Sequence, residues 1–269
     1  MKMKKFLKIL EITGWVLMTV GLFVLLGFTI NQHNSEVCKK YIIRIDYGKA
    51  DVLVTESDIY KVVRSTGNLL KGQQLGSIDF ERIEREINHQ SYVKDAQVYM
   101  TLDGVVEIDI VQRQPILRIF NEKGESFYLD GLGNLLPLNP AFSARVLVAT
   151  GSIPEPFSMK ACYLNDKVRK NDSVTYYSVM NNLYKLSAFI TENKFLKAQI
   201  EQIYVDPNGE LELIPRIGTH TIVIGNAENL QDKFERLFVF YMYGLSKTGW
   251  SKYNIINIEF KNQVVCSKI

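Results

Sequence analysis

Residues whose side chains could support catalysis or metal binding are few in this chain and widely spaced. The cysteines and histidines share no metal-ligand spacing. They are Cys38, Cys162 and Cys266, and His33, His89 and His220. The sequence holds no nucleophile elbow, zinc-protease motif, Cys-x-x-Cys pair or glycine-rich phosphate loop. Acidic residues are plentiful, but no two of them stand out as a catalytic pair. We therefore expect no enzymatic activity, no cofactor and no metal, and for His220 a structural or surface position rather than the role of a catalytic base.

The charges of the chain also argue against a nucleic-acid partner. The formal net charge of +3 arises in the first 30 residues, where four lysines face a single glutamate, Glu11. The rest of the chain holds 28 basic and 28 acidic residues. A neutral chain of this kind lacks the basic surface that binds phosphates. The three cysteines do not form a disulfide framework, although one pair could bridge.

Residues 12–30 form a run of nineteen residues without a formal charge, ITGWVLMTVGLFVLLGFTI. As an α-helix this run would be about 28 Å long, close to the ~30 Å thickness of the bilayer interior. It is longer than the core of a usual signal peptide, and no small-residue cleavage site follows it. We therefore predict a retained transmembrane helix rather than a cleaved signal. Its membrane-anchoring residues would include Trp15, Leu17, Phe23, Leu25 and Phe28.

The charges beside this run indicate its orientation. Residues 1–11 carry Lys2, Lys4, Lys5 and Lys8, which the positive-inside rule places in the cytoplasm. Residues 31–40 would then be a linker on the other side. The remainder of the chain, up to residue 269, would lie outside the cytoplasm.

Residues 41–114 show the pattern of a small α+β domain in the order strand, helix, helix, strand, strand. Tyr41–Ile45 is β-branched, and Thr55 and Asp79 are suited to cap two amphipathic helices. A strand from Val93 to Thr101 leads through a turn into one with strict alternation. In that second strand the residues predicted to be buried are Val106, Ile108 and Ile110. Two helices should therefore cover one face of a three-stranded sheet.

The pattern of residues 115–269 predicts a second α+β domain, a mixed β-sheet with packed helices. Short strands are expected at 116–120, 126–130, 145–149, 200–205 and 211–214. A helix is expected between Asp172 and Asn193, and another starts at Leu230. The second helix has an apolar face made of Leu230, Phe234, Leu237, Phe238 and Tyr241. Two last strands, 255–260 and 264–266, should close the chain.

Three phrases of the first domain form a pattern that is known from one family. They are S-I-D-F-x-x-I-E, S-Y-V-K-D-A-Q-V and G-V-V-E-I-D-I-V-Q-R-Q-P-I. This pattern resembles the POTRA domain of the FtsQ/DivIB cell-division proteins. The phrase Y-L-D-G-L-G at 128–133 and the segment from Arg216 onward resemble the β domain of the same family. The resemblance covers residues 40–269 approximately.

This resemblance implies a single-pass protein of the bacterial inner membrane at the division septum, with its domains in the periplasm. It implies a non-catalytic scaffold that recruits FtsB-like and FtsL-like single-pass partners during septal peptidoglycan synthesis, with other divisome components reaching the POTRA domain. A POTRA-type chaperone for envelope protein transport is the first alternative. A membrane-anchored cell-wall enzyme is the second.

The end of the chain is the predicted partner-binding site. A final strand has a covalent neighbour on one side only, so its other edge is free to accept a partner strand. In the FtsQ family the last strands receive FtsB and FtsL. If 260–266 is one strand, Phe260, Asn262 and Val264 share one face, and Lys261, Gln263 and Val265 share the other. We expect the Phe260 face to meet the partner, with Tyr243 as a further contact.

Overall fold

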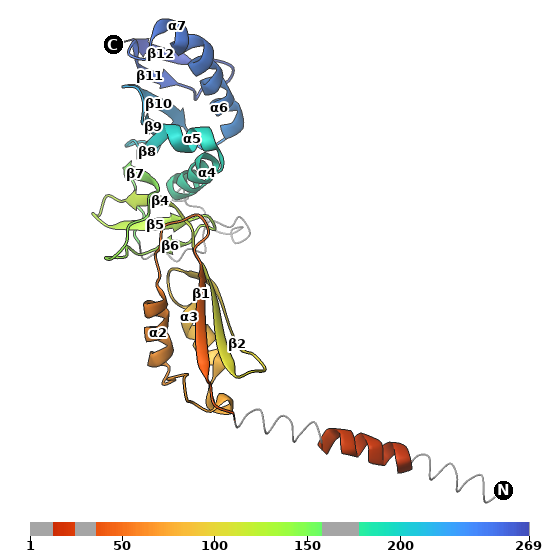
Figure 1. Cartoon of the computed structure of the whole chain (residues 1–269). Coiled ribbons are helices and arrows are strands. Elements are labelled where there is room, and N and C mark those ends of the chain that lie inside the picture. Colours follow the sequence, from red (N-terminus) through yellow and green to blue (C-terminus); the bar gives the residue numbers. More distant parts are fainter. Residues whose placement is uncertain (1–12, 25–35, 158–177, 269) are drawn as a thin grey trace, which may run out of the picture. The chain divides into compact units, whose positions relative to one another are not determined.

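The computed structural model describes residues 13–24, 36–157 and 178–268, which fall into two compact units (Figure 1). The boundary between the units lies between Gln112 and Arg113. The segment Tyr47–Leu53 belongs to the C-terminal unit although it precedes most of the N-terminal unit in the sequence. Each unit has its own hydrophobic core.

The predicted membrane span at 12–30 lies partly outside the described residues. A helix covers residues 13–24, and Trp15, Leu17 and Phe23 are exposed on it. Leu25 and Phe28 lie outside the described residues. No helix in the described part of the chain has both the length and the apolar character needed to cross a bilayer.

The N-terminal unit is a three-stranded sheet with two helices on one side (Figure 1). The strand order is β1-β3-β2, in which β3 runs parallel to β1 and antiparallel to β2. The elements in chain order are β1 (Lys40–Asp46), α2 (Glu56–Ser65), α3 (Phe80–Asn88), β2 (Val93–Met100) and β3 (Val105–Gln112). This is the predicted order of strands and helices.

Both helices begin at the predicted capping residues. The Thr55 hydroxyl accepts a hydrogen bond from the backbone N–H of Asp58, and the Asp58 carboxylate accepts one from the Thr55 N–H. These two bonds form a capping box, which satisfies backbone groups that the first helical turn leaves free. The Asp79 carboxylate likewise accepts from the N–H of Arg82 at the start of α3.

Alternation along β3 determines which side chains enter the core of this unit. Val106 and Ile108 are fully buried together with Ile83 and Ile87 of α3.

Ile108→Ala should lower the free energy of unfolding of this unit by about 3 kcal/mol, because truncation of a buried isoleucine leaves a cavity. Hydrogen exchange of the β3 amides measures this loss. Lys94→Ala, at an exposed position of β2, is the control, and an equal loss in both variants would contradict the register.

The opposite face of this sheet is polar and hydrogen-bonded across all three strands. Arg44 of β1 forms ion pairs with Glu107 and Asp109 of β3. The Tyr99 hydroxyl of β2 donates to the same two carboxylates, and these bonds raise the pKa of Tyr99 to about 12. The hydrogen bonds from Arg44 and Tyr99 lower the pKa of both carboxyl groups.

The C-terminal unit is built on a nine-stranded mixed sheet. Its strand order is β12-β11-β10-β9-β8-β7-β4-β5-β6. The first five strands in the chain are β4 (Pro115–Phe120), β5 (Ser126–Asp130), β6 (Leu135–Leu136), β7 (Leu147–Gly151) and β8 (Ile200–Val205). The others are β9 (Leu211–Pro215), β10 (Thr221–Gly225), β11 (Tyr253–Asn257) and β12 (Val265–Lys268). The strands β4, β7 and β8 are parallel neighbours, and β10 is parallel to β11.

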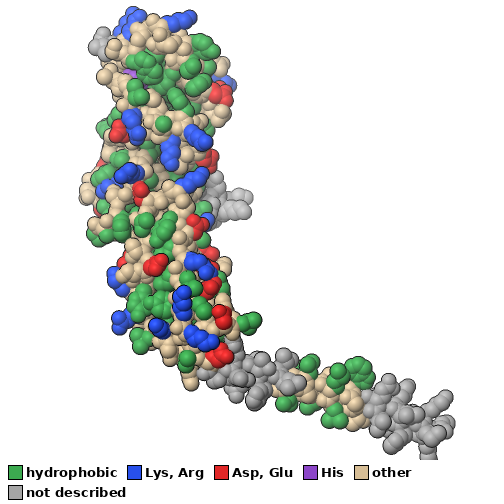
Figure 2. Space-filling view, viewed as in Figure 1, with side chains coloured by type: hydrophobic (Ala, Val, Ile, Leu, Met, Phe, Trp, Pro, Cys, Tyr) green, Lys and Arg blue, Asp and Glu red, His purple; other side chains and the backbone are tan. Residues whose placement is uncertain are grey.

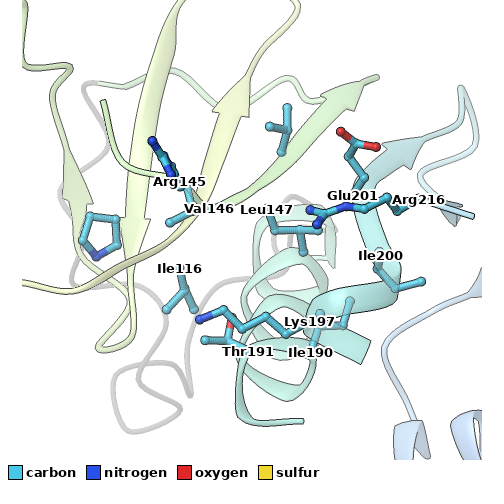
Figure 3. Close-up of a pocket in the computed structure, with 12 residues that line it drawn as sticks. Ile116, Arg145, Val146, Leu147, Ile190, Thr191, Lys197, Ile200, Glu201 and Arg216 are labelled. Atoms are coloured by element: carbon cyan, nitrogen blue, oxygen red, sulfur yellow. The ribbon is translucent and has the colours of Figure 1, made fainter. Parts of the chain in front are cut away.

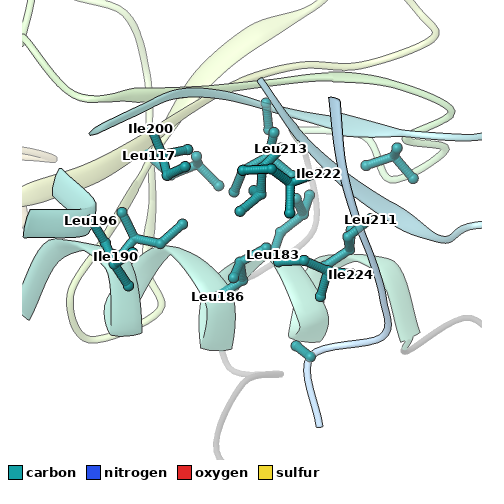
Figure 4. Packing of buried hydrophobic residues seen from close by; sticks show 14 of the residues in the cluster. Leu117, Leu183, Leu186, Ile190, Leu196, Ile200, Leu211, Leu213, Ile222 and Ile224 are labelled. Carbon is teal, nitrogen blue, oxygen red and sulfur yellow. The ribbon is translucent and has the colours of Figure 1, made fainter. Parts of the chain in front are cut away.

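Helices cover one face of this sheet and enclose its core (Figure 1). They are α4 (Ser178–Glu192), α5 (Lys194–Gln199), α6 (Leu230–Val239) and the short α7 (Ser246–Thr248). Leu183, Leu186 and Ile190 of α4 meet strand residues such as Leu117 and Leu213 in this core (Figure 4). A π-helical segment, Phe240–Leu245, joins α6 to α7.

Two details of this unit differ from the sequence-based expectations. The helix that starts at Leu230 buries Phe234, Leu237 and Tyr241 as predicted, but Phe238 is 47% exposed. Phe238 packs edge-on against Phe195 of α5, with 5.5 Å between the ring centroids. The strand expected from Arg145 begins only at Leu147, because the N–H of Arg145 bonds to the carboxylate of Asp51 instead of a neighbouring strand.

Candidate functional site

The described residues contain no cluster of three or more His, Cys, Asp or Glu that could hold a metal ion. Cys38 and Cys266 are free thiols, and burial raises the pKa of each. Cys162 and His33 lie outside the described residues. The first candidate site is a surface, the edge formed by the strand β12.

β12 forms one edge of the nine-stranded sheet, with β11 as its only strand neighbour in the described residues. The N–H of Ile258 donates to the carbonyl of Val223 in β10, so the even-numbered residues of β11 direct their backbone groups to β10. The odd-numbered residues of β11 therefore face β12. Val265 and Ser267 are the partners of these residues.

The backbone of Cys266 consequently points away from the sheet. Cys266 is opposite Ile256, and backbone groups alternate between the two sides of an antiparallel strand. Its N–H and C=O are thus directed to the free edge, where they are available to another strand. The Cys266 side chain packs partly against the core, whereas Val265 is 44% exposed on the other face.

The alternation expected over 260–266 is wrong, and the strands expected at 255–260 and 264–266 are both shifted along the chain. β11 ends at Asn257 and β12 begins at Val265, so Phe260 and Asn262 lie in the turn that joins them. Asn262 has φ of +61°, a left-handed conformation that asparagine tolerates and that interrupts a strand. Phe260, Asn262 and Val264 therefore share no strand face. Phe260 is 46% exposed, while Val264 packs partly against the core.

Tyr243 lies on the π-helical segment and is 69% exposed. It belongs to a series of exposed apolar side chains on α5, α6 and this segment, and Figure 2 shows hydrophobic side chains over this part of the unit. The members are Phe195, Phe238, Val239, Met242 and Tyr243. The structure does not place Tyr243 on the same strand or helix as the β12 residues.

Two cations of α6 fix the strands that lead to this edge. The ammonium group of Lys233 is buried and donates to the carbonyls of Ile224 and Asn226 at the end of β10, both at 2.9 Å. Burial lowers the pKa of Lys233. The guanidinium of Arg236 donates to the carbonyl of Ile258, just after β11, at 3.0 Å. Both bonds hold α6 against the strands from which β12 extends.

His220 lies in an aromatic cluster between β10 and the π-helical segment. Its Nε2 is 2.8 Å from the hydroxyl of Tyr241, and Trp250 packs against both rings. Its Nδ1 is buried without a hydrogen-bond partner. Burial lowers the pKa of His220 and raises that of Tyr241. The hydrogen bond to Tyr241 and the packing of Trp250 against both rings hold the helical segment on the sheet.

The C-terminal unit should lose stability when the pH falls below about 6.5, the ordinary pKa of histidine. The pKa of His220 is lower in the folded state, so the unfolded chain binds its proton at higher pH and acid favours unfolding. Urea unfolding followed by the fluorescence of Trp250 measures this effect between pH 7.5 and 5.5. In His220→Phe the dependence should be smaller, and an unchanged pH dependence would contradict the assignment.

The sequence did not reveal the free backbone of Cys266 or the cluster of His220, Tyr241 and Trp250. The direction of the Cys266 backbone follows from the pairing of β10 with β11, but the register of that pairing cannot be read from a single sequence. The cluster joins His220 to Tyr241 and Trp250, which lie 21 and 30 positions further along the chain, a separation that no local pattern connects.

Two comparisons with known families agree with this architecture. The model of the FtsQ/DivIB C-terminal related domain matches residues 114–267, which is more than half of the chain. The model of the POTRA-like domain matches residues 36–111. A search of curated proteins gave no match. The longer of the two family matches includes all nine strands of the C-terminal sheet except the last residue of β12, and the chain belongs to the FtsQ/DivIB family of cell-division proteins.

Proposed function

We propose that this protein is a non-catalytic, membrane-anchored scaffold of the division machinery that recruits small single-pass partners similar to FtsB and FtsL. Membership of the FtsQ/DivIB family supports the scaffold role in division. The uncharged run at 12–30 would be the anchor, with the lysine-rich residues 1–11 in the cytoplasm and both units outside it at the septum.

The single observation that carries the partner proposal is the free edge of β12. A partner segment that adds to this edge would exchange backbone hydrogen bonds with Cys266. Val265, next to Cys266 in the strand, and Phe260, in the turn before the strand, are exposed and would contact partner side chains. Binding of this kind draws its affinity from the backbone and its selectivity from alternate side chains.

Depletion combined with affinity capture tests the proposal. Cells depleted of the protein should become filamentous or chained, because a septum cannot be completed without the scaffold. The tagged full chain should co-purify from dividing cells with small single-pass proteins that have coiled-coil segments.

Other outcomes would support the alternatives. Normal division with accumulation of unfolded envelope proteins would favour a transport chaperone. Release of peptidoglycan fragments by the purified chain would favour a cell-wall enzyme.

A further inference from the structure

A cavity opens at the end of the C-terminal sheet where the parallel strands β4, β7 and β8 begin. Its volume is about 550 Å³, within the range of ligand pockets, and it lies between these strands and the C-terminal end of α4 (Figure 3). Arg145, Lys197, Arg216 and Glu201 supply its charged lining. It is separate from β12, which the proposed function uses.

The cavity exists because β7 starts later than its two neighbours. β4 begins at Pro115 and β8 at Ile200, but β7 pairs with them only from Leu147 onward. The chain before Leu147 is drawn away, since the N–H of Arg145 bonds to the carboxylate of Asp51 at 2.9 Å. Because no strand lies between the first residues of β4 and those of β8, a notch remains between these two strands.

Three cations border this notch without ion-pair partners among the described residues. The side chains of Arg145, Lys197 and Arg216 are exposed, and no described carboxylate lies within ion-pair distance of them. Figure 3 shows them spread around the cavity rather than bundled on one side. Because Glu201 is the only carboxylate among the described residues of the lining, these residues carry a net charge of +2.

The backbones that carry these cations are held in place. Besides the bond of Arg145 to Asp51, the N–H of Arg216 donates to the carbonyl of Gln199 at 2.6 Å. The N–H of Lys197 donates to the carbonyl of Asn193 at 2.9 Å. The backbone at each of these three residues is therefore fixed, which lowers the entropic cost of binding an anion between their side chains.

The floor of the cavity is apolar. It is formed by Ile116, Val146, Leu147, Ile190 and Ile200. Apolar side chains of a ligand would be buried on this floor, while its anionic groups would meet the surrounding cations. A phosphate polymer carries the charge but no apolar side chain, so it would leave the floor uncovered.

We propose that this notch binds an acidic peptide segment of a partner protein, with glutamate or aspartate residues on either side of a large aliphatic residue. The aliphatic side chain would occupy the floor, and the carboxylates would pair with Arg145, Lys197 and Arg216. The site is four strand positions from β12, roughly 19 Å at the usual spacing between strands. The two sites can therefore act independently.

Fluorescence anisotropy on the purified full chain tests this proposal. The probe is a labelled peptide Glu-Leu-Leu-Glu-Glu-Leu, and its counterparts are a peptide with lysine for glutamate and a soluble glycerol-phosphate polymer. The acidic peptide should bind, and its affinity should fall several-fold from about 0.05 to about 0.5 M NaCl. The double variant K197E/R216E should bind it about tenfold more weakly or worse.

Lys185→Glu is the matched control, because Lys185 is exposed on α4 and does not line the cavity. It should bind the peptide as the unchanged protein does. If K197E/R216E fails to fold, Lys197→Gln and Arg145→Gln give the same test without charge reversal. Equal binding of the acidic and basic peptides, tighter binding of the polymer, no salt dependence, or no loss in the variants would overturn the proposal. Partner capture through β12 is measured separately. A negative result with the acidic peptide therefore does not decide whether β12 binds the small single-pass partners.

Discussion

Gly151→Ala is expected to lower the free energy of unfolding of the C-terminal unit by about 4–5 kcal/mol, a large effect for one methyl group. Gly151 ends β7 with φ of +103° and is paired with Val205 of β8. A Cβ atom at this position would lie 2.1 Å from the Val205 carbonyl oxygen. That oxygen accepts the hydrogen bond of Ser152, so relief of the clash requires part of the β7–β8 pairing to separate.

Gly249→Ala is the control for backbone conformation alone. Gly249 has a similar φ of +90°, but no atom lies within 4 Å of a Cβ built on it. Its replacement should cost about 1–3 kcal/mol, because φ of +90° with ψ of +149° lies in a region that almost only glycine adopts. Urea unfolding followed by Trp250 fluorescence measures both variants. Equal losses would show that the close approach of Val205 is not what requires glycine at 151.

The fold of the N-terminal unit could be predicted because its signals are local. The cap residues Thr55 and Asp79 lie next to the helices that they begin, and the alternation of Val106, Ile108 and Ile110 lies within one strand. Its parallel pairing of β1 with β3 follows once two helices separate β1 from the β2–β3 hairpin.

The C-terminal unit was less predictable because its register depends on distant contacts. The start of β7 is determined by Asp51, which is 94 residues before Arg145 in the sequence. The insertion of β4 between β7 and β5 is another such contact. The cationic notch follows from the same displacement, so its residues come from five separate segments that no sequence pattern links.

The partner-binding residues could be predicted only in part. The sequence predicts strand alternation through 260–266, but a turn centred on Asn262 interrupts it. The edge position of the last described strand was nevertheless correct. The outward direction of the Cys266 backbone required the pairing of three strands, β10, β11 and β12.

Cys266→Pro is expected to abolish capture of the small single-pass partners from dividing cells. Proline removes the Cys266 N–H, which β12 directs to its free edge, and it cannot donate to an added strand. The internal pairing of β12 should persist, because Val265 and Ser267 face β11. Circular dichroism and Trp250 fluorescence should therefore remain close to those of the unchanged protein.

Two matched variants separate the backbone from the side chain and from folding. Cys266→Ala keeps the N–H and loses only the partly buried thiol, so it should capture the partners normally. Val265→Pro removes an N–H that faces β11, so it should weaken the edge of the sheet itself and lower the stability of the unit. If Cys266→Pro folds and captures its partners as well as Cys266→Ala does, partner binding does not use the free edge of β12. If only Val265→Pro loses capture, the partners recognise the shape of the intact sheet edge rather than its outward hydrogen-bonding groups.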